Sequence, residues 1–194
     1  MKESVKNLES EKIMSDLRRI VTEENIKINE PMSKHTSFKT GGPADFFVVA
    51  KNISEVEAVM KFAKENNIPL YVTGNGSNLL VKDQGIRGIV AKLELNDYSI
   101  GKQTDCAYIT VGSGMALARL AIIALENELT GLENMAGIPG TIGGAVRMNA
   151  RAHGKEIKDI VKEIKTIDYS GNIHIFTNKD AQFEYRKSIF SNEE

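Results

Sequence analysis

The chain has 194 residues, of which 41% are hydrophobic and 26% charged, and its formal net charge is −1. This is the composition of an ordinary globular protein, long enough for one sizeable core or one domain of two lobes. Because Lys and Arg are scattered, no basic stripe is present to neutralise phosphates, and we expect no nucleic-acid partner. No apolar run approaches the roughly 20 residues that span a bilayer. With a single cysteine and a charged N-terminus, the sequence predicts a cytoplasmic protein without a membrane partner.

The N-terminal segment predicts a helical leader. Residues 1–28 place apolar side chains at helical spacing among many charges, which indicates an amphipathic helix that docks onto the rest of the chain. The remaining residues, 29–194, are expected to form one domain with a first lobe over about 29–100 and a second over about 101–194.

A βα unit is expected in the first lobe. Residues 45–49 are typical of a strand, and Ser54 with Glu57 predicts a capping box that opens a helix. The helix should end at residues 66–67 and be followed by a strand over 70–73, whose carboxyl end is where ligands bind in such sheets. The helix face expected to be buried comprises Val56, Val59, Met60 and Ala63.

The second lobe begins with a predicted strand over residues 106–111, in which Cys106 is expected to be buried. A helix over roughly 115–129 follows, and Gly131 is placed to cap its C-terminus. Turn residues at 170–172 predict a hairpin. The inward face of the predicted helix comprises Leu117, Leu120, Ala121, Ala124 and Leu125.

Two glycine-dense stretches point to a bound dinucleotide: Gly-Asn-Gly-Ser-Asn at 74–78 and Gly-Ile-Pro-Gly-Thr-Ile-Gly-Gly at 137–144. Glycine adopts positive φ cheaply, so consecutive amides can form a concave nest that suits a pyrophosphate. Leu79 stands where a dinucleotide fingerprint has its third glycine, and no Gly-Lys-Ser/Thr follows, so a Rossmann domain and a P-loop are disfavoured. The alternative is that each stretch is an ordinary tight turn.

Four motifs in a fixed order carry a family resemblance. They are His-Thr-Ser-Phe-Lys-Thr-Gly-Gly-Pro-Ala at 35–44, Gly-Asn-Gly-Ser-Asn-Leu-Leu-Val at 74–81, the glycine-rich run at 131–150, and Tyr-Arg-Lys-Ser-Ile-Phe at 185–190. From about residue 28 to its end the chain resembles the UDP-N-acetylenolpyruvoylglucosamine reductases, flavoenzymes of bacterial peptidoglycan precursor synthesis. The resemblance implies an α+β fold, the two-lobed FAD-binding domain of the vanillyl-alcohol oxidase-like (PCMH-type) class.

The resemblance also implies a reaction and a set of cofactor contacts. The family reduces the enolpyruvyl ether of UDP-N-acetylglucosamine to UDP-N-acetylmuramate with FAD and NADPH. This reaction belongs to cell-wall biogenesis and hence to cell shape and division. The chain is expected to be a monomer. The residues expected to bind FAD are Val72, Gly74, Asn75, Gly76, Ser77, Asn78, Leu79, Gly114, Gly137, Ile138, Pro139, Gly140, Thr141, Gly143, Gly144 and Ala145.

An arginine is expected at the reacting carboxylate. Reduction of an α,β-unsaturated carboxylate pushes negative charge onto the carboxylate as an enolate, so a fixed cation is needed there. By the resemblance this is Arg186, whose planar fork can bind both oxygens, and Tyr185 and Asn149 are expected to contact the substrate. Without the motif, Arg186 would be read as a surface residue paired with Glu184 or another acid.

Three further expectations concern completeness. The family's proton donor, Ser or Cys, and its assisting glutamate lie in a C-terminal substrate domain that is expected to be absent, because the chain ends at Glu194. Ser188 is not expected to be that donor. We therefore expect a partial form that cannot complete turnover alone. A non-catalytic flavin-binding module, or a flavin oxidase acting on another substrate, is the alternative.

The chain also departs from the family pattern near the second glycine stretch. Arg147 stands where an apolar or aromatic residue is expected, and Arg151 and His153 replace a usual Gly and Tyr, which puts local packing in question. The other histidines, His35 and His174, are distant in sequence, and no spacing matches a metal site, so no metal is expected.

Overall fold

The computed structural model describes residues 2–191, with side chains from Ser10 onward, and the chain forms two compact units. Unit 1 comprises the described residues up to Thr73 together with Leu79–Leu93. Unit 2 comprises Gly74–Asn78 and the described residues from Glu94 on. The first glycine stretch thus follows a strand of unit 1 in the chain but makes its contacts in unit 2.

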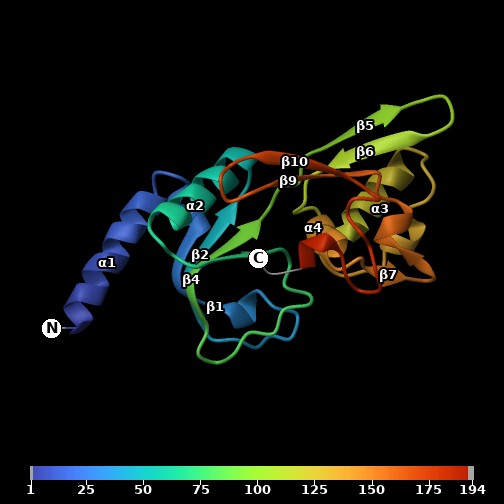
Figure 1. Cartoon of the computed structure of the whole chain (residues 1–194). Helices are drawn as coiled ribbons and strands as arrows, with labels where there is room; N and C mark the ends of the chain where they lie inside the picture. The colour runs from blue at the N-terminus through green and yellow to red at the C-terminus, as the bar shows by residue number, and fades with distance from the viewer. Residues whose placement is uncertain (1, 192–194) are drawn as a thin grey trace. The chain divides into compact units, whose positions relative to one another are not determined.

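Unit 1 is built on a four-stranded sheet (Figure 1). Its order is β1 (Ile26–Pro31), β2 (Pro43–Ala50), β4 (Ile86–Leu93) and β3 (Leu70–Thr73). β1 is antiparallel to β2, whereas β2, β4 and β3 are parallel. The strands predicted from residues 45–49 and 70–73 are therefore confirmed, and β4 lies between them.

α2 (Ile53–Glu65) packs against this sheet (Figure 1). Its predicted apolar face is confirmed, because all four of its predicted residues are buried. The predicted capping residue is wrong: the N-cap lies two residues earlier, at Asn52, whose side chain accepts the bond from the Glu55 amide at 2.9 Å. Ser54 is already inside the first turn. The predicted end is confirmed by the C-cap at Asn66.

The leader helix is shorter than expected from its sequence. α1 spans Lys2–Leu17, and residues 23–25 form a 3-10 turn before β1 starts at Ile26. Leu17 and Val21 are buried in a cluster with core residues of the sheet and α2, so the leader does pack onto unit 1. The strand β1 was not predicted, because its sequence contains Lys, Asn and Glu between the apolar residues and has no long apolar run.

Unit 2 contains three two-stranded sheets (Figure 1). The strand pairs are β5 (Tyr98–Lys102) with β6 (Ala107–Val111), β7 (Arg151–Ala152) with β8 (Lys155–Glu156), and β9 (Glu163–Ile167) with β10 (Ile173–Thr177).

Two of these strand pairs contain predicted features. β6 and the hairpin of β9 and β10 are confirmed, and Gly171 takes a φ of 83° in the connecting turn. The expectation for Cys106 is wrong: it precedes β6 and is exposed. The local alternation of residues could not distinguish the last loop residue from the first strand residue.

α3 (Leu117–Glu126) is two residues shorter at its start and three at its end than predicted. Leu117, Leu120 and Ala124 are buried as expected, but Leu125 is 76% exposed and Ile123 is buried instead. Asn127, not Gly131, is the C-cap, and it donates from its side chain to the Ile123 carbonyl oxygen at 2.8 Å. The side chain of Asn127 thus caps the C-terminus of α3, a role that was expected for Gly131.

α4 (Ile142–Arg147) begins within the second glycine stretch, where no helix was predicted. Thr141 is its N-cap, and the Gly144 amide donates to Thr141 Oγ1 at 3.4 Å. The core beneath it includes Leu117, Met135 and Ile157. The remaining 3-10 turns span Met32–Lys34, Glu133–Met135, Ile157–Asp159 and Ile189–Ser191. No helix within residues 2–191 is long and apolar enough to cross a membrane.

Candidate functional site

The two glycine stretches predicted from sequence meet in unit 2. Ser77 Oγ donates a hydrogen bond to the Pro139 carbonyl oxygen at 3.3 Å. A Cβ built on Gly74 would lie 2.3 Å from Thr141 Oγ1, and one on Gly140 would lie 2.8 Å from Ser77 Oγ. Segments far apart in the chain therefore share one site, and glycine is required for this close approach.

A third segment, which contains Gly114, joins them. The amides of Ile142 and Gly143 donate to the carbonyl oxygens of Met115 and Ser113 at 2.9 and 2.8 Å. A Cβ on Gly143 would stand 2.9 Å from the Ser113 Cβ. Gly114 is buried. Sequence reasoning missed Ser113, for which the Gly-Ser-Gly spacing before α3 was the available signal.

The joined loops present backbone donors without protein partners. The N–H groups of Asn75–Asn78 donate no hydrogen bond to any residue in 2–191, and the same holds for Gly137 and Gly140. Gly76 has a φ of 62° and is buried. A buried amide such as that of Gly76 is nearly always paired in folded proteins, and a group of neighbouring N–H donors without partners among the described residues suits an anion. This arrangement fits the pyrophosphate of a dinucleotide.

The glycines of the two stretches serve two different purposes. Gly143 and Gly74 make room for other parts of unit 2, as the short distances above show. At Gly137, by contrast, an added Cβ would meet no atom of the described residues within 4 Å. Gly137 thus leaves open space beside exposed backbone, which is what close contact with a ligand requires.

Four other predicted cofactor residues have side chains with different surroundings. Ile138 and Ala145 pack in the core of unit 2, so their cofactor contacts would be through the backbone. Leu79 packs against a core cluster of unit 1, and Val72 is 55% exposed on β3. The predicted role of these four residues stays a prediction.

Tyr185 and Arg186 form the tip of a tight turn. The Glu184 amide donates to the Lys187 carbonyl oxygen at 2.9 Å, and the Lys187 amide donates back at 3.3 Å. Arg186 takes a φ of 55°, which non-glycine residues rarely adopt. Both side chains at the tip are exposed, and the Arg186 guanidinium pairs with no acid among the described residues, Glu184 included. The alternative of a paired surface arginine therefore finds no acid partner in the part of the chain that the structure describes.

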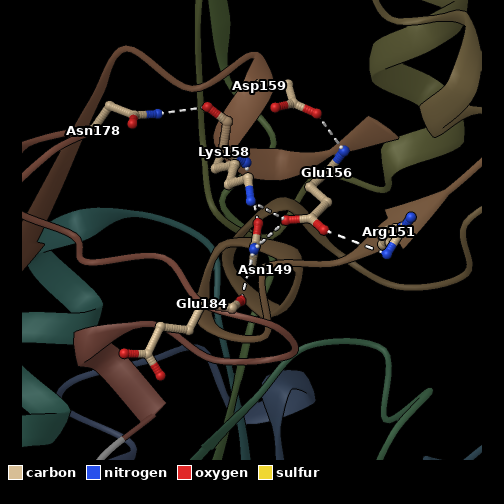
Figure 2. A network of polar contacts seen from close by, with 7 residues as sticks. All are labelled: Asn149, Arg151, Glu156, Lys158, Asp159, Asn178 and Glu184. Carbon is tan, nitrogen blue, oxygen red and sulfur yellow. Dashed lines mark hydrogen bonds and ion pairs between the residues drawn. The ribbon is translucent and has the colours of Figure 1, made fainter. Parts of the chain in front are cut away.

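Asn149 lies next to Glu184, at one base of this turn, and is only 1% exposed (Figure 2). Its Nδ2 donates to Glu156 Oε2 and to the Glu184 carbonyl oxygen, each at 2.8 Å. Its Oδ1 accepts from the Lys158 amide at 3.2 Å. The amide expected to contact substrate is thus committed to protein partners, and its predicted substrate contact is not tested by them.

Glu156 is the central anion of this network (Figure 2). Lys158 Nζ lies 2.8 Å from Glu156 Oε2, and Arg151 Nη1 lies 3.7 Å from Oε1 across the short β7–β8 pair. The hydrogen bond from Lys158, followed by that from Asn149, holds the pKa of Glu156 below its ordinary value of 4.5. Arg151 therefore has a partner at the surface and does not disturb the core. Glu156 was missed from the sequence, although its spacing to Asp159 is that of a capping box.

Ser188 is buried, and its Oγ donates to the Arg147 carbonyl oxygen at 2.8 Å. Ser191 Oγ donates to the same oxygen at 2.6 Å. Arg147 is the last residue of α4, so both hydroxyls satisfy a carbonyl that the helix leaves open. The Arg147 side chain is exposed, with Nη2 3.5 Å from the Ser191 carbonyl oxygen, so this arginine too lies outside the core.

The histidines are dispersed. His153 is exposed in the β7–β8 turn, with a φ of 49°. His174 Nε2 lies 2.9 Å from Asp168 Oδ2, and the His35 ring stacks on Phe47 with 3.9 Å between centroids. Within residues 2–191, no group of three or more His, Cys, Asp or Glu side chains is arranged to hold a metal ion.

Residues 44–177 match the family described as FAD binding domain. The chain belongs to this family. It is 45% identical over 179 residues to the UDP-N-acetylenolpyruvoylglucosamine reductase of Lachnoclostridium phytofermentans, covering 91% of this chain and 58% of that protein. It is 44% identical over 184 residues to the enzyme of the same name from Clostridioides difficile, covering 95% of this chain and 60% of that protein. The resemblance seen in the motifs is thus confirmed, and the chain spans about 60% of the length of these relatives.

Solved structures support the fold. The UDP-N-acetylenolpyruvylglucosamine reductase of Thermus caldophilus matches with a TM-score of 0.67 and 29% identity, over 84% of this chain and 57% of that one. p-Cresol methylhydroxylase matches with a TM-score of 0.62 at 16% identity, over 90% of this chain and 38% of that one, which shows the fold alone. The predicted α+β fold of the PCMH-type class is therefore confirmed, and FAD is the cofactor that the family implies for the unpaired amides.

Proposed function

We propose that this chain provides the FAD site and the enolate-stabilising arginine of a UDP-N-acetylenolpyruvoylglucosamine reductase. The reaction is the NADPH-dependent reduction of the enolpyruvyl ether of UDP-N-acetylglucosamine to UDP-N-acetylmuramate. The observation that carries the proposal is the meeting of two glycine stretches in which the amides of Asn75–Asn78, Gly137 and Gly140 have no partners in the described residues. The curated relatives of 45% and 44% identity bear the name of this reductase.

The residues divide the work between binding and charge stabilisation. The amides of Asn75–Asn78, with those of Gly137 and Gly140, would hold the cofactor's phosphates. Bound FAD supplies two-electron transfer from NADPH to the substrate's carbon–carbon double bond. As that bond is reduced, negative charge develops on the neighbouring carboxylate, and the exposed guanidinium of Arg186 would stabilise it. The exposed Tyr185 lies beside it for contact with the sugar nucleotide.

The setting of the reaction follows from its product. UDP-N-acetylmuramate is a precursor of peptidoglycan, so the proposed activity belongs to cell-wall synthesis and thereby to cell shape and division. A water-soluble nucleotide sugar and NADPH are both substrates of the cytoplasm, where we place this chain. We propose that it acts as a monomer on small-molecule substrates, without a nucleic-acid or membrane partner.

The first test is flavin reduction. The chain is purified with FAD, and its absorbance spectrum is recorded without oxygen while NADPH is added; FAD in the same buffer without protein is the control. We expect stoichiometric FAD whose oxidised bands bleach with NADPH. A protein that binds no FAD, or binds FAD that NADPH does not reduce, would contradict the proposal.

A second step separates the reductase from an oxidase. The reduced protein is mixed with the enolpyruvyl UDP-sugar, or with oxygen alone, and the return of the oxidised bands is followed in a stopped-flow instrument. Hydride transfer from the flavin precedes protonation of the α-carbon, and water can supply the proton that the expected partial form has no donor to give. The proposed function therefore predicts that the sugar reoxidises the flavin faster than oxygen does. Rapid reoxidation by oxygen and none by the sugar would favour a flavin oxidase.

A further inference from the structure

We propose that Asn149 and Ser188 are positioning residues that clamp the turn carrying Arg186 to the end of α4. This inference rests on the proposed function, because it assigns what the clamp is for. The turn has two bases, Glu184 on one side of the tip and Lys187-Ser188 on the other. Each base forms a hydrogen bond with a residue in 147–149, the stretch that contains the last residue of α4 and the two that follow it.

The two bonds run in opposite directions. On one side Asn149 Nδ2 donates to the Glu184 carbonyl oxygen at 2.8 Å (Figure 2). On the other, Ser188 Oγ donates to the Arg147 carbonyl oxygen at 2.8 Å. The tip between them therefore has both its entry and its exit fixed to the same short stretch of backbone.

Burial makes these bonds hard to replace with water. Asn149 and Ser188 are each 1% exposed. A buried donor that loses its partner incurs the full cost of desolvation, so each side chain strongly favours the arrangement in which its bond is made. The tip itself is exposed, so its position depends on these two bases.

The amide of Asn149 is itself oriented by its neighbours. Its Oδ1 accepts from the Lys158 amide, so Nδ2 must be the group that faces Glu156 and the Glu184 carbonyl. Asn149 has a φ of 41°, a region in which asparagine is enriched. The network in Figure 2 thus fixes the donor that holds the turn.

The clamp also holds a residue with a strained backbone conformation. Arg186 occupies the left-handed region at a φ of 55°, which for a residue other than glycine is sparsely populated and is maintained only where the surroundings determine it. Released at either base, the turn can relax to other conformations and carry the guanidinium away. A displacement of about 1 Å at a reacting group can lower a rate about 100-fold.

The test uses Asn149→Gly, which tolerates the positive φ while removing the amide, and Ser188→Ala. Ser188→Thr keeps the hydroxyl and is the conservative variant. Asn25→Ala is the matched control, because Asn25 is also a buried asparagine, but its amide bonds Thr22 in unit 1. All are compared as the full chain loaded with FAD.

Limited trypsin digestion reports the position of the turn without any reaction. Mass spectrometry follows the peptides that begin at Lys187 or Ser188. We expect cleavage there to be at least about tenfold faster in Asn149→Gly and Ser188→Ala, close to wild type in Ser188→Thr, and unchanged in the control, since cleavage tracks the open population. Equal cleavage in all variants would overturn the clamp.

Flavin kinetics report the positioning role. We expect NADPH to reduce the flavin at the wild-type rate in both clamp variants, while the limiting rate of reoxidation by the enolpyruvyl sugar falls about 10–100-fold. A purely structural role would change both steps together or neither, and unchanged reoxidation would overturn the positioning role. A wild-type chain that NADPH cannot reduce contradicts the proposed function instead, and trypsin cleavage then decides the clamp alone.

Discussion

At the scale of single residues, Arg186 differs from the other arginines near the site. Arg151 has Glu156 as its ion-pair partner, and Arg147 lies 3.5 Å from the Ser191 carbonyl oxygen. Arg186 has no acid partner among the described residues and sits at positive φ. An exposed cation in a strained turn is what the proposed contact with a ligand's carboxylate requires.

Removing this charge should impair one step only. We expect Arg186→Ala to lower the limiting rate of flavin reoxidation by the enolpyruvyl sugar about 10²–10³-fold, the typical loss of one electrostatic donor, and Arg186→Lys to lower it less. Flavin reduction by NADPH should be unchanged. Stopped-flow absorbance measures both, and Arg119→Ala, a surface arginine of α3 paired with Glu126, is the control. Reoxidation at the wild-type rate in Arg186→Ala would remove the assigned role.

The glycines differ in the space available for an added methyl group. Gly74→Ala places a Cβ 2.3 Å from the hydroxyl of buried Thr141, so we expect overpacking to lower the free energy of unfolding by about 1–3 kcal/mol. Gly137→Ala and Gly101→Ala both add a methyl group in open space, so their stability should be near that of wild type. FAD titration should then show weaker binding for Gly137→Ala than for Gly101→Ala. Equal affinities would mean that Gly137 does not face the cofactor.

At the scale of elements, α3 shows how burial differs along one helix. Leu117 is fully buried in the core of unit 2, whereas Leu125 on the same helix is 76% exposed. Both were expected to face inward, because both fit an apolar stripe at helical spacing. The helix begins later and ends earlier than that pattern suggests, and Ile123 is buried although it was not among the residues expected to face inward.

These two leucines form a matched pair. We expect Leu117→Ala to lower the free energy of unfolding by about 2–5 kcal/mol, since it leaves a cavity in the core. Leu125→Ala removes the same atoms from an exposed site and should change it by no more than about 0.5 kcal/mol. Urea unfolding followed by circular dichroism measures both. Similar losses for the two variants would contradict the burial described for α3.

Local patterns predicted those elements whose signal is carried by their own residues. The buried face of α2 and the hairpin with Gly171 follow from periodicity and turn chemistry, and both are found. Helix caps were predicted less well, because Asn52 and Asn127 compete locally with the expected Ser54 and Gly131. The meeting of the glycine stretches was expected only from chemistry, since sequence spacing does not report distance in space.

Buried polar contacts were the least predictable part of the site. Nothing in the sequence pairs Ser188 with the Arg147 carbonyl oxygen or Asn149 with Glu184, because each bond depends on the tertiary arrangement of segments 35 to 41 residues apart. The motif placed Asn149 and Ser188 near the site, yet it did not say that their hydrogen bonds would be used within the protein.

At the scale of the whole molecule, each unit has a carboxylate whose pKa is lowered by hydrogen bonds from neighbouring side chains. In unit 1, burial raises the pKa of Glu30, but hydrogen bonds from His35 and Lys34 outweigh it, so the pKa lies below its ordinary value of 4.5. In unit 2, the Lys158 hydrogen bond lowers the pKa of Glu156 in the same direction. Near pH 4.5 the unfolded chain therefore binds more protons at these sites than the folded chain, so stability rises with pH there.

Acid should therefore weaken the fold. The stabilisation from these carboxylates is fully present above about pH 4.5 and is lost as pH falls through the lowered folded-state pKa. We expect urea midpoints of the wild type to fall from about pH 6 to about pH 3, and Glu156→Gln to fall less steeply and to be less stable at neutral pH. A Glu156→Gln variant that parallels the wild type across this range would show that Glu156 does not contribute.

Cofactor binding should change the hydrogen–deuterium exchange of the amides that are proposed to bind it, because these amides have no partners among the described residues. Without such partners, the N–H groups of Asn75–Asn78 should exchange with deuterium rapidly in the chain without FAD. Saturating FAD should slow exchange there and around Gly137 and Gly140, since bonds to the phosphates and exclusion of water both oppose exchange. The β5–β6 hairpin already pairs its amides in a ladder and serves as the internal control, with no change expected. If mass spectrometry found slowing in neither glycine stretch while FAD was bound, the cofactor would lie elsewhere on the chain and the glycines would be explained by packing alone.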